Sequence, residues 1–142
     1  MTYATLQQLI DRFGEHTLVQ ATDRGAVATG AIDAGVVDRA LADTDAEING
    51  YLAGRYVLPL VETPPLIADK ALAIAIYKLH VFAPDPKIKD DYEQAMKALR
   101  EIASGVIRLP AQGVEPAVTG NSGVRFIDRA RPLTPESLTG FI

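Results

Sequence analysis

Apolar residues recur at intervals of three and four along most of this chain, which is the spacing of one face of an α-helix. The first such stretch follows Thr5, and Gln8 three residues later predicts a capping box at the start of a short helix. Gly14 is expected to end that helix in a left-handed conformation. A second short helical stretch is predicted over 15–21, with Leu18 buried. The chain should therefore begin with two short helices.

A long helix is predicted after a loop rich in glycine and small residues over 22–32. Asp33 is its expected N-cap, and the periodic pattern runs to about Tyr56. Gly50 and Gly54 each weaken such a helix by roughly 1 kcal/mol relative to alanine. Either close passage of another backbone or a frayed helix end would account for them. The predicted apolar face consists of Val37, Ala40, Leu41, Thr44, Ile48, Tyr51, Leu52 and Tyr56.

The third long segment, over 65–82, is apolar almost all round. A proline-rich linker over 58–65 precedes it, and proline both stops one helix and suits the start of the next. A helix with so little polar surface should be central to the core or covered by a neighbouring subunit. Its apolar residues are Leu66, Ile67, Ala68, Ala71, Leu72, Ala73, Ile74, Ala75, Ile76, Leu79, Val81 and Phe82.

The last predicted helix has Asp85 as its N-cap, Pro86 at its first position and Gly105 as its stop signal. The chain is therefore predicted to be all-α, with a small bundle of about four main helices forming one domain over 1–105. The buried stripe of this helix should be Ile88, Tyr92, Ala95, Met96, Leu99 and Ile102.

Residues 106–142 change in character, because glycines and prolines interrupt every periodic pattern there. The segment nevertheless keeps apolar clusters and a local group of arginines. This composition predicts an irregular, extended C-terminal arm that becomes ordered against a partner. Arginine and aromatic residues are enriched at interface anchors. The candidate interaction residues are Arg125, Phe126, Ile127, Arg129, Arg131, Leu138, Phe141 and Ile142.

Composition narrows the classes of function. The chain has 142 residues, a formal net charge of −4 and no cysteine. A negative balance argues against a tight, sequence-independent grip on a phosphate backbone, and the absence of cysteine excludes disulfides and thiolate metal sites. The amino terminus lacks the pattern of a secretion signal, and no run approaches the ~18 apolar residues of a membrane span. We expect the protein to reside in the cytoplasm of the cell that produces it.

Candidate chemistry is sparse. His16 and His80 do not occur at the helical spacing of a metal pair, so a packed or helix-end role is expected for His80. The acids of the long helix suggest a solvated face more strongly than carboxylate catalysis or a cation site. No nucleophile elbow or phosphate loop occurs. We therefore expect no catalysis, no cofactor and no bound metal. The four acids are Asp38, Asp43, Asp45 and Glu47.

Four stretches carry a resemblance to a known family of phage Mu-like proteins. They are residues 3–14 (YATLQQLIDRFG), 42–60 (ADTDAEINGYLAGRYVLPL), 64–66 (PPL) and 92–99 (YEQAMKAL), and the glycyl-tyrosine stretch through Pro59 is the most specific of them. Members of this family often carry an acidic, glycine-rich turn after the counterpart of Thr22-Asp23-Arg24. This chain has Gly25-Ala26-Val27-Ala28-Thr29 there, which weakens any expectation of a cation site.

The family resembles the helical head–tail connectors of long-tailed phages, which form rings, commonly of twelve subunits, under the portal. The resemblance implies a structural subunit in the virion neck, assembled in the host cytoplasm. Its partners would be further copies of itself, the portal protein and the next neck or tail-terminator protein. DNA would pass through the ring without sequence-specific binding, and no membrane would be involved. The alternative from the residues alone is a small helical regulatory or scaffolding module that binds a single protein partner.

Overall fold

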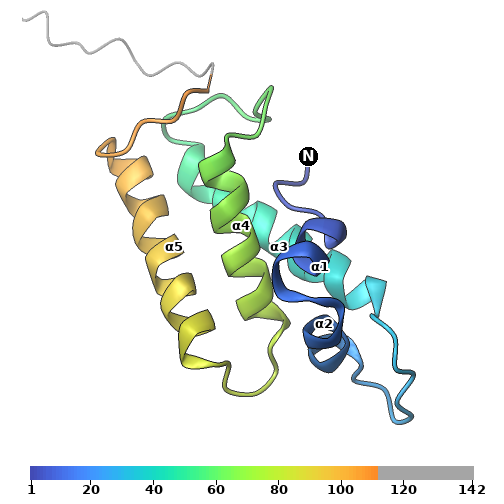
Figure 1. Ribbon diagram of the computed structural model, residues 1–142. Helices are drawn as coiled ribbons and strands as arrows, with labels where there is room; N and C mark the ends of the chain where they lie inside the picture. Colours follow the sequence, from blue (N-terminus) through green and yellow to red (C-terminus); the bar gives the residue numbers. More distant parts are fainter. Residues whose placement is uncertain (112–142) are drawn as a thin grey trace, which may run out of the picture.

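The computed structural model describes residues 1–111, and this part of the chain is all-helical, without a strand. The predicted fold class is confirmed. Figure 1 shows α4 between α5 and the pair of short helices, with α3 crossing behind, so that α4 is the central element of the bundle. The helices are α1 (Leu6–Phe13), α2 (Glu15–Thr22), α3 (Ala34–Leu52), α4 (Pro65–Leu79) and α5 (Pro86–Ser104).

The three predicted N-cap residues are confirmed. Thr5 and Gln8 form a reciprocal capping box, with N–H to oxygen distances of 3.3 and 2.9 Å. The Asp33 carboxylate accepts from Val36 N at 3.2 Å at the start of α3. Asp85 does the same for Lys87 N at 2.9 Å, ahead of Pro86. Each cap satisfies a backbone donor that has no partner inside its own helix.

Three expectations about helix ends were wrong. Gly14 has a φ of 86° but a ψ of 148°, so it is not in the left-handed helical conformation. The long helix α3 ends at Leu52 rather than near Tyr56, and α4 ends at Leu79 rather than at Phe82. Local periodicity cannot detect these ends, because apolar residues continue beyond each of them.

Side chains account for the early end of α4. In a longer helix, the His80 N–H would donate to the Ile76 carbonyl, but here it donates to Tyr77 O at 3.2 Å. The His80 ring Nδ1 lies 2.7 Å from Ile76 O instead, and the Arg24 guanidinium donates to Leu79 O. Side chains thus bond two of the last four carbonyls, those of Ile76 and Leu79, which would otherwise have no partner where the helix stops.

The core lies along α4. All residues from Ala71 to Ile76 are buried, so helix α4 is enclosed within the single chain, which is the first of the two predicted alternatives. Tyr77 of α4 stacks on Tyr92 of α5, with ring centroids 4.0 Å apart and planes within 9°. Such pairing stabilises beyond the area it buries. The resulting α4–α5 contact is the most extensive in the bundle.

Polar contacts attach the amino-terminal segment and α1 to the bundle. Tyr3 N donates to an Asp45 carboxylate oxygen at 2.9 Å, and the Tyr3 hydroxyl donates to Asn49 Oδ1. Arg12 Nη1 lies 2.6 Å from Asp69 Oδ1. The hydrogen bonds from Lys70 and Arg12 hold the pKa of Asp69 below its usual value, although partial burial acts in the opposite direction. Most of these groups are partly exposed, so they orient α1 more than they stabilise the fold.

The glycines of the helical body differ in whether the structure leaves room for a side chain. A Cβ on Gly50 would meet nothing within 4 Å, and the same holds for Gly54, so the suggestion that another backbone passes close to them was wrong. Gly50 lies inside α3 on its exposed side. Gly105, in contrast, has a φ of 83° and a ψ of 10°, and its Cβ would lie 2.5 Å from Arg55 Cζ.

We therefore expect Gly50→Ala to raise the free energy of unfolding by about 0.5–1 kcal/mol, because alanine loses less conformational entropy in a helix. Gly105→Ala should lower it by about 1–2 kcal/mol, because an L-residue is strained in the left-handed region. Urea denaturation followed by circular dichroism measures both. Equal effects of the two substitutions would contradict this assignment of the helix end.

Candidate interaction surfaces

Candidate metal ligands are scattered over the described part of the chain. Within residues 1–111, no three histidine, cysteine or acidic side chains gather closely enough to hold a metal ion. No helix in this part of the chain is long and apolar enough to cross a membrane. His16 is exposed beside Gln20, with 3.1 Å between its Nε2 and the amide nitrogen, whereas His80 helps to end α4. Each histidine ring thus contacts a residue four positions away in the chain.

The acids of α3 do not act together. The Asp45 carboxylate bonds to Tyr3 N, and Glu47 forms an ion pair with Lys78 of α4, 2.8 Å apart. Asp38 and Asp43 are exposed. Two of the four acids therefore connect α3 to its neighbours, and the other two lie on the solvent side of the helix.

The loop between α2 and α3 is organised by Asp23. Its Oδ2 accepts hydrogen bonds from Thr29 N and Gly30 N, both at 2.9 Å. The buried Thr22 hydroxyl accepts from Asp33 N at 3.1 Å and donates to Leu18 O at 2.8 Å. The carboxylate that begins the loop thus accepts hydrogen bonds from the loop backbone itself.

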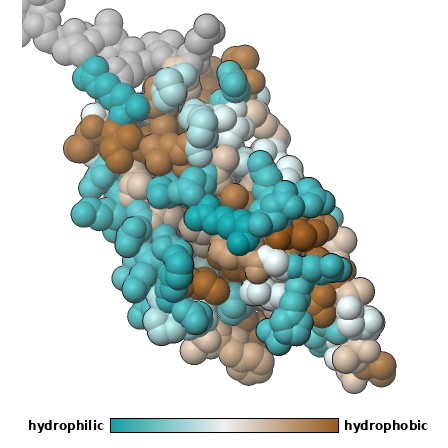
Figure 2. Space-filling model, viewed as in Figure 1, coloured by the Kyte–Doolittle hydropathy of each residue, from teal (hydrophilic) through white to brown (hydrophobic). Residues whose placement is uncertain are grey.

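Apolar side chains are exposed at one end of the bundle, which we call the linker end. It comprises the α3–α4 linker and the chain that follows α5, residues 105–111. The exposed fractions are 59% for Val57, 87% for Val61 and 75% for Val106. Figure 2 shows apolar surface at the tip near the carboxyl end of α5. Large apolar residues left in water at one site are typical of a surface that contacts a partner.

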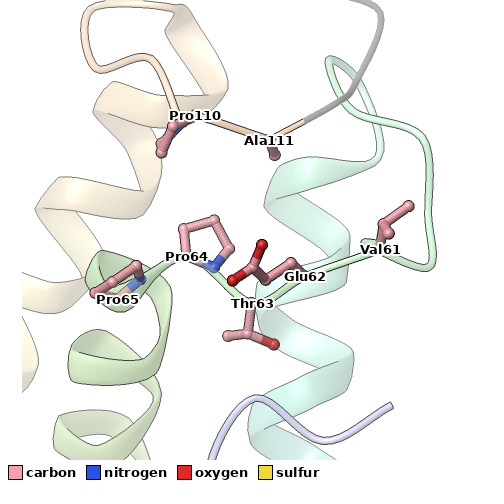
Figure 3. Close-up of a pocket in the computed structure, with 7 residues that line it drawn as sticks. All are labelled: Val61, Glu62, Thr63, Pro64, Pro65, Pro110 and Ala111. Carbon is pink, nitrogen blue, oxygen red and sulfur yellow. The ribbon is translucent and has the colours of Figure 1, made fainter.

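A pocket of about 440 Å³ lies at the linker end. Its walls come from two segments far apart in the sequence, 61–65 and 110–111. Figure 3 shows Pro110 and Ala111 on one side of the pocket, facing Pro64 and Glu62 on the other. The sequence contained no signal for this pocket, because it exists only where the chain after α5 returns to the linker.

Leu109 fixes that return. Its side chain is 7% exposed and belongs to the core, and its backbone N–H donates to the Tyr56 hydroxyl at 3.0 Å in a buried hydrogen bond. The chain immediately after α5 is thus packed on the bundle as far as Leu109. This contact positions one wall of the linker-end pocket.

Tyr56→Phe should lower the free energy of unfolding by about 1–3 kcal/mol, because it leaves the buried Leu109 N–H without its acceptor. Tyr51→Phe is the matched control, since Tyr51 is half-buried and its hydroxyl makes no hydrogen bond within the described residues. Thermal melts of the two variants would measure the difference. Indistinguishable melting temperatures would contradict the role given to the Tyr56 hydroxyl.

The opposite end, which we call the turn end, carries a second exposed apolar group. Val27 of the α2–α3 loop is 78% exposed, and Val81 and Phe82 of the α4–α5 turn are 63% and 88% exposed. Val81 and Phe82 border a pocket of about 360 Å³, together with Gln20, Ala21, Asp23, Arg24 and His80. Sequence periodicity had placed Val81 and Phe82 inside a helix. Pro84 gave no signal against this, because a proline restricts the residue directly before it, which is Ala83.

The eight candidate interaction residues predicted in the arm, from Arg125 to Ile142, lie outside the described residues. Of the predicted arm, only 106–111 is described, and this part packs beside the linker as outlined above. The two exposed apolar ends therefore supplement the predicted set and do not test it.

Comparison with known proteins places these features in a family. The family model described as Bacteriophage Mu, Gp36 matches residues 3–128. The chain is 34% identical to "Gene product J" of Escherichia phage Mu over 105 residues, which cover 74% of each chain. It is also 31% identical over 140 residues to "Mu-like prophage FluMu protein gp36" of Haemophilus influenzae, covering 99% of this chain and 98% of the relative. This is therefore a phage protein, and it belongs to the family of bacteriophage Mu Gp36.

Proposed function

We propose that the protein is a structural subunit of a phage head–tail connector, in which copies form a ring under the portal that continues the DNA channel and joins head to tail. The proposal rests on one observation, the exposed apolar surface of this protein from a phage family. Its core closes within one chain, yet both ends of the bundle present large apolar side chains to solvent. Such a surface is suited to assembly with other chains.

A ring requires two different, mutually complementary surfaces on each subunit, because each copy contacts one neighbour on either side. The linker end and the turn end differ in residues and in shape, which supports a heterologous contact over a symmetric dimer. The negative net charge of −4 also suits a protein that lets a polyanion slide past without holding it. The partners would be the portal and the next neck or tail-terminator protein, in the neck of the virion.

The stoichiometry of the full-length protein tests this proposal. Light scattering and electron microscopy of the protein, alone and mixed with the portal protein of the same phage, should show a closed ring of high order or a ring added to the portal. Imaging of the purified virion neck should show the same ring next to the portal. The proposal would be overturned if the protein stays a monomer or dimer, does not bind the portal and is absent from virions. A complex with one cellular protein would instead favour a regulatory module.

A further inference from the structure

The linker-end pocket has an open, apolar surface with one charged group beside it. Val61, Pro64, Pro65, Pro110 and Ala111 supply most of its lining. Its volume lies within the range of about 300–1,000 Å³ that is usual for sites that bury a ligand or an inserted side chain. The Glu62 carboxylate is exposed at this site and forms no ion pair with any residue of 1–111. An occupant with apolar side chains and a neighbouring cation would fit this chemistry.

The chain itself contains such an occupant beyond the described residues. Phe126 and Ile127 form an apolar pair with Arg125 directly before it and Arg129 two residues after it. An aromatic and a branched aliphatic side chain can pack on proline rings and valine, while an arginine next to them can face a carboxylate. Aromatic and arginine residues are also those that most often anchor protein interfaces.

We propose that the segment Arg125–Arg129 of one copy docks in the linker-end pocket of an adjacent copy, with Phe126 and Ile127 on the prolines and Arg125 facing Glu62. This inference rests on the proposed ring, because it assigns the surface through which neighbours are joined. Each copy then gives one segment and receives one, which is the heterologous contact that closes a ring.

The length of chain available permits this contact. Ala111 lies at the rim of the pocket, and an extended chain from there to Arg125 spans up to roughly 50 Å. A compact domain of about 111 residues has a radius of gyration of only about 13 Å. The segment can therefore reach the same pocket on a neighbouring subunit. A docked segment would add to any contact between the helical bodies of neighbouring subunits. Once those bodies are in contact, the segment binds at high effective concentration, which strengthens the ring.

Mixed cysteine variants test the contact between copies directly, because the natural chain contains no cysteine. One full-length preparation carries Val61→Cys alone, and the other carries Asp128→Cys alone with a tag that changes its size. Asp128 lies within the docking segment, and its substitution leaves Arg125, Phe126 and Ile127 in place. The two are mixed, assembled with the portal and treated with a short bismaleimide crosslinker. Val27→Cys mixed with Asp128→Cys is the matched control, since Val27 is a similarly exposed valine at the other end, 78% against 87%.

A crosslinked pair of unequal chains with Val61→Cys, and at least several-fold less with Val27→Cys, is the expected result. Rings that form normally without this crosslink would overturn the inference and leave the proposed function standing. A chain that carries both Val61→Cys and Asp128→Cys covers the remaining case. In that variant, a crosslink within single chains and no ladder of multimers would overturn the inference, because the segment would then dock on its own subunit. Failure to form any ring would remove the proposed function and this inference together.

Charge reversal tests the polar part of the contact. Glu62→Arg and Arg125→Glu should each reduce the crosslink between positions 61 and 128 by about two- to five-fold, as expected of a partly exposed ion pair. Combining the two reversals in one chain should restore it. Unchanged crosslinking in both single reversals would show that Glu62 and Arg125 do not face each other.

Discussion

Ala73→Glu should prevent stable folding of the subunit, with a loss of several kcal/mol in the free energy of unfolding. Ala73 lies in the middle of α4 and is 4% exposed, so a carboxylate placed there would be surrounded by core side chains without a partner. Burial of an unpaired charge costs far more than the loss of an alanine methyl contact. The free energy of unfolding of a domain is only about 5–15 kcal/mol, so this one substitution would remove much of it.

Ala46→Glu provides the control for this prediction. Ala46 is exposed on α3, so the same substitution there should change the free energy of unfolding by less than about 1 kcal/mol. Chemical denaturation of both variants, followed by circular dichroism, gives the comparison. A folded Ala73→Glu variant with near-normal stability would show that α4 is less enclosed than the structure indicates.

A chain ending after Ala111 should fold normally and fail to join the ring or the portal. The described core lies within residues 1–111, so this shortened chain retains it, including Leu109 and its hydrogen bond to Tyr56. All eight candidate interaction residues, from Arg125 to Ile142, are removed. Ordering a segment of this length costs on the order of 1–2 kcal/mol per residue in the backbone alone. Many of its contacts must therefore form together, and their loss should abolish assembly rather than weaken it slightly.

Circular dichroism and thermal melting report folding of the shortened chain, while electron microscopy with the portal reports assembly. A cut after Gly105 is the informative comparison, because it also removes Leu109 from the core. Loss of a buried leucine should cost about 1.5–3 kcal/mol, so that variant should melt earlier as well as fail to assemble. Functional virions built from the chain that ends at Ala111 would show that the arm is dispensable.

Where structure depends on neighbours in the chain, the sequence was sufficient. The capping residues Thr5, Asp33 and Asp85 and the stop at Gly105 act through bonds within one helical turn, so their chemistry is local. The buried faces of α3 and α5 also follow from the 3.6-residue period. A membership in the Mu Gp36 family was equally accessible, because it rests on residue identities.

Where structure depends on residues distant in the chain, only the tertiary fold decided the outcome. The end of α4 at Leu79 depends on Arg24, which reaches the Leu79 carbonyl from the end of α2. Beyond this end of the helix, Val81 and Phe82 lie in solvent, although their apolar character had suggested burial. The linker-end pocket likewise exists because Leu109 packs on the core beside Tyr56. Sequence periodicity determined which residues form helices, whereas packing between distant segments decided where those helices stop and which apolar residues remain exposed, because neither depends on the local backbone alone.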